Sequence, residues 1–411
     1  MEQIALTGNE VVAMGMKQIN PEVVAAYPIT PQTEIVQLFS QFVADGEVDT
    51  EFITVESEHS AMSATVGAAA GGVRAMTATS ANGLALMFEV VYIAASTRLP
   101  VVMPVVNRAL SAPINIHCDH SDAMGCRDSG WIQLFAENSQ QVYDNLIQAV
   151  RIAEDDRVRL PVMVNMDGFI ISHAVENMQP ISDDLIREFI GDYQPRYSLL
   201  DPEQPATFGP LDLQDYYFEH KRQQVDGMEH VPGVVMEVAG EFAELSGREY
   251  GLLEKYKMMD AEVALIGLGS TMGTARAAVD ELRQEGKKVG LINLRLFRPF
   301  PCRTVFQVLE GIEVLGVLDR AESFSLQGGP LYTEICSCLY QNQNNLGEQN
   351  RDNGGLPWVK NYIYGLGGRD ITVTEIKDIF KQLLNIQKQK QTGDKSGDRQ
   401  EVVYFGVRDN S

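Results

Sequence analysis

Four polar residues stand at or just after the ends of short apolar runs, and their types suit the binding of a small anion. They are Thr30, Glu58, Arg108 and Asp167. A guanidinium that follows six apolar residues, 101–106, is costly unless an anion pairs with it. Arg108 is therefore a candidate to bind the carboxylate of a substrate through two parallel hydrogen bonds.

Internal contacts could also satisfy these side chains. Arg108 could pair with Asp119, Asp122 or Glu58 of the same chain. The segment D-H-S-D at 119–122 has the composition of a metal or acid/base cluster but no standard ligand spacing, so we interpret it as a structural loop. Any one of the four residues, taken singly, could instead be a turn or helix-cap residue.

The elements that must position these residues read as a parallel sheet. Apolar runs at 23–29, 51–57, 73–80, 100–107 and 161–167 alternate with helical patterns. Runs that are apolar on both faces are typical of parallel strands covered by helices. The predicted fold class is α/β, a doubly wound parallel sheet, in which ligands bind beyond the carboxyl ends of the strands.

The pattern divides the chain into two domains and a tail. We predict a first domain over 1–250, which includes a long irregular connection from about 178, and a smaller α/β domain over 260–386. Residues 387–411 read as a polar, flexible tail whose apolar, β-like end docks on a partner.

Composition narrows the class of protein. The chain has 411 residues, a formal charge of −23 and no long basic stretch, so nucleic acid is not expected as a partner. No apolar stretch reaches the roughly 20 residues of a membrane helix, and the polar N-terminus is not a leader, so we expect a cytoplasmic protein that does not bind membranes. Five scattered cysteines without a C-x-x-C pair indicate neither a disulfide framework nor a metal cluster.

Five motifs in order resemble one known family. They are Y-P-I-T-P at 27–31, S-E-x-x-A at 57–61, R-A-L-S-A-P at 108–113, D-H-S-D at 119–122 and D-G-F-x-x-S-H at 167–173. Over roughly residues 1–385 the chain resembles the alpha subunits of pyruvate:ferredoxin oxidoreductase (pyruvate synthase) and related 2-oxoacid:ferredoxin oxidoreductases. The resemblance implies a thiamine-diphosphate pyrimidine-binding domain followed by a transketolase C-terminal-like domain.

The resemblance also implies a role for each matching residue. Glu58 would hydrogen-bond the aminopyrimidine ring of the cofactor and so help to activate it, with Pro28 and Ile29 beside the ring. Thr30 and Arg108 would bind the 2-oxoacid and orient it for attack. Glu58, Thr30 and Arg108 are thus the predicted catalytic residues, and no metal ligand is predicted in this chain.

The chain alone does not read as a complete enzyme. It has neither a G-D-G…N motif for magnesium and diphosphate nor a cysteine set for a [4Fe–4S] cluster. The resemblance implies a beta subunit that holds Mg2+ and the diphosphate, and gamma and delta subunits, with the iron–sulfur clusters in partner subunits. The implied reaction converts pyruvate and coenzyme A to acetyl-CoA and CO2 and reduces ferredoxin. 2-Oxoisovalerate or another 2-oxoacid remains an alternative substrate, and Glu56 remains a competitor for the role of Glu58.

A different class of enzyme is also open. Residues 267–273, G-L-G-S-T-M-G, follow a predicted strand and open a predicted helix, as in a dinucleotide-binding turn. That pattern would make the chain an NAD(P)-dependent oxidoreductase. Two departures disfavour it: Met272 stands where the common pattern has glycine, and the next strand lacks the acidic residue that binds the ribose.

Overall fold

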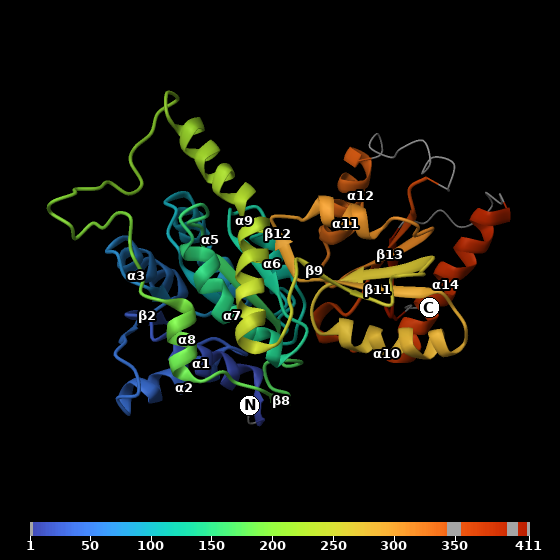
Figure 1. The fold of residues 1–411 in the computed structure, drawn as a ribbon, viewed down its shortest axis with the longest axis horizontal. Helices are drawn as coiled ribbons and strands as arrows, with labels where there is room; N and C mark the ends of the chain where they lie inside the picture. Colours follow the sequence, from blue (N-terminus) through green and yellow to red (C-terminus); the bar gives the residue numbers. More distant parts are fainter. Residues whose placement is uncertain (1–2, 343–354, 393–401, 409–411) are drawn as a thin grey trace.

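The structure, a computed structural model, describes residues 3–342, 355–392 and 402–408 and has two α/β units side by side (Figure 1). The first unit has a seven-stranded sheet of order β12-β6-β7-β5-β4-β2-β3. Its strand pairs are parallel except that of β12 with β6. Its strands are β2 (Val23–Ala26), β3 (Glu51–Thr54), β4 (Ala75–Met76), β5 (Val102–Asn107), β6 (Ile132–Phe135), β7 (Val162–Asp167) and β12 (Leu296–Arg298).

Helices cover both faces of this sheet. Val102 and Val106 of β5 lie in one core cluster with α1 and α7, whereas Met103 and Val105 lie in another with α3 and α5. Every residue of β5 is buried, as expected of a strand with no solvent face. Among the described residues, no helix has both the length and the apolarity to cross a bilayer. The helices of this unit are α1 (Gly8–Ile19), α2 (Thr33–Ala44), α3 (Glu58–Ala70), α4 (Ala81–Leu86), α5 (Phe88–Ser96), α6 (Ser121–Gly125) and α7 (Ser139–Glu154).

A long segment links the two units. β8 (Val175–Met178) pairs antiparallel with β1 (Ile4–Thr7), and α8 (Asp183–Ile190) follows. Residues 191–216 form no helix or strand and loop out from the body before α9 (Tyr217–Ser246) returns along the first unit (Figure 1). The connection predicted from about 178 therefore contains a 30-residue helix, whose buried residues join the first core.

The second unit has a six-stranded sheet of order β15-β14-β13-β10-β11-β9. Only the pairing of β9 with β11 is antiparallel. Its strands are β9 (Leu253–Tyr256), β10 (Val263–Gly267), β11 (Val289–Leu294), β13 (Val314–Asp319), β14 (Trp358–Ile363) and β15 (Val402–Tyr404). Its helices are α10 (Thr271–Gln284), α11 (Cys302–Val308), α12 (Pro330–Asn342), α14 (Val373–Thr392) and the 3-10 turn η2 (Leu366–Gly368).

One continuous stretch of the chain divides between the two sheets. Within residues 287–297, β11 belongs to the second sheet and β12 pairs with β6 of the first. Arg295, between them, is buried and donates to Asn145 Oδ1 at 2.7 Å and to Gln148 Oε1 at 3.0 Å. These contacts with α7 turn the chain from one sheet into the other.

The C-terminal tail differs from the prediction. Residues 387–392 belong to α14, and residues 393–401 lie outside the described residues. The apolar end, expected to dock on a partner, forms β15 and pairs in parallel with β14 of this chain. Strand edges offer unpaired N–H and C=O groups, and β15 binds such an edge within its own unit.

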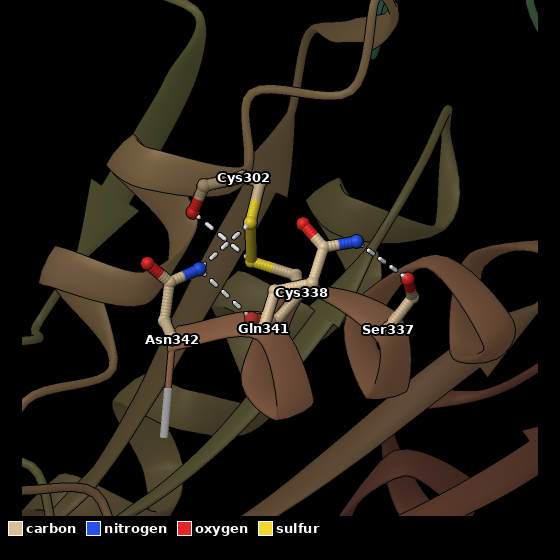
Figure 2. The surroundings of a disulfide bond; sticks show 5 residues. All are labelled: Cys302, Ser337, Cys338, Gln341 and Asn342. Carbon is tan, nitrogen blue, oxygen red and sulfur yellow. Dashed lines mark hydrogen bonds between the residues drawn. A yellow bond between two sulfur atoms is a disulfide. The ribbon is translucent and has the colours of Figure 1, made fainter. Parts of the chain in front are cut away.

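The prediction of no disulfide is wrong for one pair of cysteines. Cys302 and Cys338 form a disulfide that joins α11 to α12, with their Cα atoms 5.4 Å apart (Figure 2). The Asn342 amide donates to Cys302 Sγ and to the Cys338 carbonyl oxygen. The two residues are 36 positions apart in the sequence, so their approach depends on how the two helices pack rather than on a local motif.

Candidate active site

The carboxyl ends of the parallel strands bring the predicted residues to one edge of the first sheet. Asp167 ends β7, Arg108 follows β5, Thr30 follows β2 and Glu58 follows β3. These strands are neighbours in the order β7-β5-β4-β2-β3 and run in the same direction. This is the edge at which an open parallel sheet binds ligands.

Arg108 is buried, and its guanidinium is hydrogen-bonded to main-chain carbonyls. Nη1 donates to the Thr30 carbonyl at 2.8 Å, and Nε donates to the Asn115 carbonyl at 2.8 Å. No carboxylate of the described residues forms an ion pair with it, so the internal pair that the sequence left open is not formed. A buried guanidinium bonded only to neutral carbonyls can still pair with the carboxylate of a ligand.

Glu58 opens α3 directly after β3. Ser57 caps the helix by accepting from the Ser60 N–H, which places Glu58 in the first turn, where the helix dipole favours a carboxylate. Its side chain is buried against Gly83. A Cβ at Gly83 would lie 2.8 Å from Glu58 Oε1 and 2.6 Å from Thr79 Oγ1, so only glycine leaves room for these two groups.

Two buried hydroxyls between β4 and α4 have no hydrogen-bond partner among the described residues. They are Thr79 Oγ1, which lies against Gly83 as Glu58 does, and Ser80 Oγ, at the N-cap of α4. A buried polar atom without a partner costs about 1–3 kcal/mol, so these two hydroxyls are candidates to hydrogen-bond a ligand. Glu56, the competing candidate, is exposed and hydrogen-bonds the Ser60 hydroxyl.

The other predicted residues form a turn between β2 and α2. Pro28 and Thr30 are exposed, and Ile29 is half-buried. The Ile29 N–H donates to Gln32 Oε1 at 3.2 Å, and the buried Gln32 amide donates to the Ala78 carbonyl at 3.1 Å. The turn is therefore fixed to the segment after β4, with the Thr30 side chain accessible to a ligand.

Asp122, which was not among the predicted site residues, links the main chain of Arg108 to the start of α4. Its Oδ2 accepts from the Arg108 N–H and the Ala81 N–H, each at 3.0 Å. Its Oδ1 accepts from the Asn107 amide at 3.0 Å and the Ala123 N–H at 2.7 Å. Burial raises the pKa of Asp122 to about 6 despite these bonds. The D-H-S-D motif was the available signal, but it did not show that Asp122 binds the main chain of Arg108 rather than its guanidinium.

Asp167 belongs to a buried contact between the two units, apart from the groups around Glu58 and Arg108. Its Oδ1 bonds His120 Nε2 at 2.8 Å, and its Oδ2 accepts from Ser270 and from Arg320 Nη1 at 3.1 Å. Burial alone would raise the pKa of Asp167, but His120, Arg320 and the Ser270 hydroxyl hold it well below its usual value. Cys118, His120 and Asp167 could group around a metal ion, but the carboxylate oxygens are already engaged in these bonds.

Comparison with known proteins identifies the family. The model described as "Pyruvate flavodoxin/ferredoxin oxidoreductase, thiamine diP-bdg" matches residues 14–240, and that described as "Pyruvate:ferredoxin oxidoreductase core domain II" matches 261–376. The chain is 56% identical over 409 residues to "Pyruvate synthase subunit PorA" of Thermotoga maritima, across 100% of this chain and 99% of the relative. The chain belongs to the pyruvate:ferredoxin oxidoreductase family.

A second relative supports the assignment to the pyruvate:ferredoxin oxidoreductase family, and one solved structure supports the fold. "Ketoisovalerate oxidoreductase subunit VorA" of Pyrococcus abyssi is 43% identical over 382 residues, across 93% of each chain. The structure of a 2-oxoglutarate:ferredoxin oxidoreductase from Magnetococcus marinus superposes with a TM-score of 0.71 at 20% identity. That match covers 93% of this chain and 65% of the other. The predicted fold class and family are confirmed.

The glycine turn of this oxidoreductase chain binds its own carboxylate, which argues against the NAD(P) alternative. The Ser270 N–H at the start of α10 donates to Asp167 Oδ2 at 3.1 Å. A Cβ at Gly269, whose φ is +73°, would lie 2.8 Å from Asp167 Oδ1. A pyrophosphate would have to occupy the place that Asp167 fills. The turn at 267–273 therefore joins the two units of the family's fold and is not a nucleotide site.

Asp167→Asn is expected to weaken this contact between the units. The substitution leaves the buried Arg320 guanidinium without its carboxylate, which costs about 3 kcal/mol. Thermal unfolding of the assembled enzyme should show a melting temperature several degrees lower. Asp260→Asn is the matched control, because Asp260 pairs with Arg283 on the surface. Equal melting temperatures for the two variants would contradict the role of Asp167.

Proposed function

We propose that the chain is the alpha subunit of a pyruvate:ferredoxin oxidoreductase that converts pyruvate and coenzyme A to acetyl-CoA and CO2 and reduces ferredoxin, reversibly. The observation that carries the proposal is the buried Arg108 guanidinium, which no carboxylate of the described chain neutralises and which is hydrogen-bonded to Thr30. The choice of pyruvate is supported by 56% identity to a pyruvate synthase subunit, against 43% to a ketoisovalerate oxidoreductase subunit.

The residues around Glu58 fit part of a thiamine diphosphate. A buried carboxylate beside Gly83, together with the hydroxyls of Thr79 and Ser80 that lack partners, offers hydrogen bonds to an aminopyrimidine ring. When bound, thiamine diphosphate supplies a nucleophilic carbon and an electron sink for the decarboxylation. The role of Glu58 is to accept a hydrogen bond from the ring and to stabilise the tautomer that activates that carbon. Pro28 and Ile29 would lie beside the ring.

Arg108 and Thr30 would bind the 2-oxoacid. The guanidinium pairs with the carboxylate of pyruvate, and the accessible Thr30 hydroxyl donates to an oxygen of the same molecule. The bond from Arg108 Nη1 to the Thr30 carbonyl fixes the distance between the two groups, so the substrate is held in one orientation. Burial of the arginine strengthens the charge pair.

Partner subunits would supply the remaining groups. The sequence has no motif for magnesium and diphosphate, which we assign to a beta subunit, and no cluster-binding cysteine set, so we assign the [4Fe–4S] clusters to partner subunits. Gamma and delta subunits complete the proposed assembly, which passes electrons to ferredoxin. We place the assembly in the cytoplasm.

An anaerobic assay tests which 2-oxoacid is the substrate, with the assembled enzyme purified from its native source. Reduction of a viologen dye is measured with coenzyme A and pyruvate, 2-oxoisovalerate or 2-oxoglutarate. The proposal expects the highest kcat/KM with pyruvate. A higher value with 2-oxoisovalerate would assign the chain to the branched-chain enzymes of the family instead.

The affinity for pyruvate is expected to fall as the pH drops through about 6. The pKa of Asp122 is raised to about 6, so the carboxylate exists above that pH and the acid below it. Protonated Asp122 accepts more weakly from the Arg108 and Ala81 N–H groups, so Arg108 is held less firmly. The KM for pyruvate should therefore rise about threefold between pH 7 and pH 5. The nearby thiols of Cys118 and Cys126 stay neutral in this range, because burial raises the pKa of both.

Asp122→Asn provides the control for this pH dependence. An amide at position 122 does not titrate, so KM should be raised at pH 7 and should not change further as the pH falls. A KM that depends on pH equally in the wild type and in the variant would show that another group titrates.

A further inference from the structure

The second unit contacts the loop that carries the substrate arginine. A turn of four residues, 365–368, follows β14 and lies against residues 115–119 of the first unit. The Asn115 amide donates to the Gly367 carbonyl at 2.9 Å, and the Gly367 N–H donates to Asp119 Oδ2 at 3.2 Å. The His120 N–H also donates to the Arg320 carbonyl at 2.8 Å. The loop is thus bonded at several points to a unit that has no assigned role in the chemistry.

Asn115 joins this contact to the guanidinium. Its own carbonyl accepts from Arg108 Nε at 2.8 Å, while its side chain reaches Gly367. Its neighbour Ile114 is 80% exposed and the segment 111–114 is exposed throughout, so few core contacts fix this part of the loop. The Asn115 side chain fixes the position of the carbonyl that holds Arg108 through two bonds: it accepts from the His117 N–H at 2.7 Å within the loop, and it donates to Gly367 of the second unit.

The turn is shaped for this close approach. Gly367 has φ +62°, and a Cβ there would lie 2.4 Å from the Asn115 amide nitrogen. Gly368 has φ +81°, and a Cβ there would lie 2.2 Å from His117 Cβ. Two adjacent positions thus require glycine both for the backbone conformation and for the space that the loop takes.

We propose that the turn 365–368 and Asn115 position Arg108 for binding of the 2-oxoacid carboxylate, so that the second unit contributes to substrate affinity. Asn115 and Gly367 are positioning residues: they act through Arg108 and do not touch the substrate. This inference rests on the proposed role of Arg108. It assigns the second unit a function beyond packing and assembly.

The test uses two variants in the assembled enzyme, Asn115→Ala and Gly367→Ala. Asn115→Ala keeps the carbonyl that accepts from Arg108 and removes two side-chain bonds, the one to the Gly367 carbonyl and the one from the His117 N–H, whereas Gly367→Ala changes only the contact from the second unit. Each variant should raise the KM for pyruvate about tenfold, because a small displacement of a binding group is costly, and should leave kcat within about twofold. Bound thiamine diphosphate should remain at the wild-type level.

Gly286→Ala is the matched control for Gly367→Ala. Gly286 lies in the second unit with φ +77°, but a Cβ there would meet nothing within 4 Å. Its backbone strain is therefore similar, and its KM should equal that of the wild type. If Gly367→Ala only lowers the melting temperature and leaves KM unchanged, as a purely structural residue would, the proposal is wrong.

A double variant separates this inference from the proposed function. Combining Asn115→Ala with Arg108→Lys should raise KM by less than the product of the two single effects, because both changes act on one interaction. If Arg108→Lys raises KM and the two effects multiply in full, the positioning role fails and the role of Arg108 stands. If Arg108→Lys leaves KM unchanged, the proposed function itself fails.

Discussion

Arg108→Ala is expected to lower kcat/KM for pyruvate by about 10³-fold in the assembled enzyme, mainly through KM. The substitution removes the buried charge that would pair with the substrate carboxylate. Arg108→Lys should also be severely impaired, because an ammonium cannot bond the Thr30 and Asn115 carbonyls and the substrate in the same geometry. Bound thiamine diphosphate should be unchanged in both variants.

Arg98→Lys is the matched control for Arg108→Lys. The Arg98 guanidinium also donates only to main-chain carbonyls, those of Val158, Arg159 and Gln223, but it lies between α5 and α9, away from the site. Its substitution should leave kcat/KM near the wild-type value. Loss of thiamine diphosphate from Arg108→Ala, with pyruvate affinity retained, would contradict the assignment of Arg108 to the substrate.

Glu58→Gln is expected to lower kcat by about 10³-fold with little change in the KM for pyruvate. The amide nearly matches the carboxylate in size, so the fit against Gly83 is kept, but it cannot stabilise the activated tautomer of the ring. Anaerobic steady-state kinetics of the assembled enzyme, with the thiamine diphosphate content measured in parallel, distinguish the loss of activation from the loss of cofactor.

Glu56→Gln is the control for this prediction. Glu56 is two residues away and exposed, whereas Glu58 is buried, so the substitution at 56 should leave kcat unchanged. A large loss of kcat in Glu56→Gln together with a fully active Glu58→Gln would transfer the role to Glu56.

Local patterns in the sequence were enough to predict the parallel sheet. The runs at 23–29 and 161–167 contain β2 and β7, because strands buried on both faces leave continuous apolar stretches, and the run at 51–57 contains β3, an edge strand in which only Phe52 and Ile53 are partly buried. β6 and β14 were not predicted. The polar Gln133 interrupts β6, and β14 begins with the half-polar sequence W-V-K-N, so their strand character depends on the neighbours with which they pair.

The sequence could predict that the candidate residues meet at one edge of the sheet, but it could not predict the hydrogen bonds that connect them. Thr30, Glu58 and Arg108 stand at strand ends, which a parallel sheet brings to one edge. Asp122 accepts from the main-chain N–H groups of Arg108 and Ala81. Every residue except proline has such a group, so the residue types do not show which N–H groups Asp122 binds. The same holds for contacts between the units, such as that of Asp167 with Ser270, because they depend on how two separately folded sheets meet.

The measurement that tests the central claim most directly compares the assembled enzyme with this chain alone in an anaerobic assay that contains pyruvate, coenzyme A and either a viologen dye or NAD(P). The account predicts that the assembled enzyme reduces the dye in a reaction that needs both pyruvate and coenzyme A, and that the chain alone reduces neither acceptor. Reduction of NAD(P) by the chain alone would contradict the account, because it would make the glycine turn at 267–273 a nucleotide site.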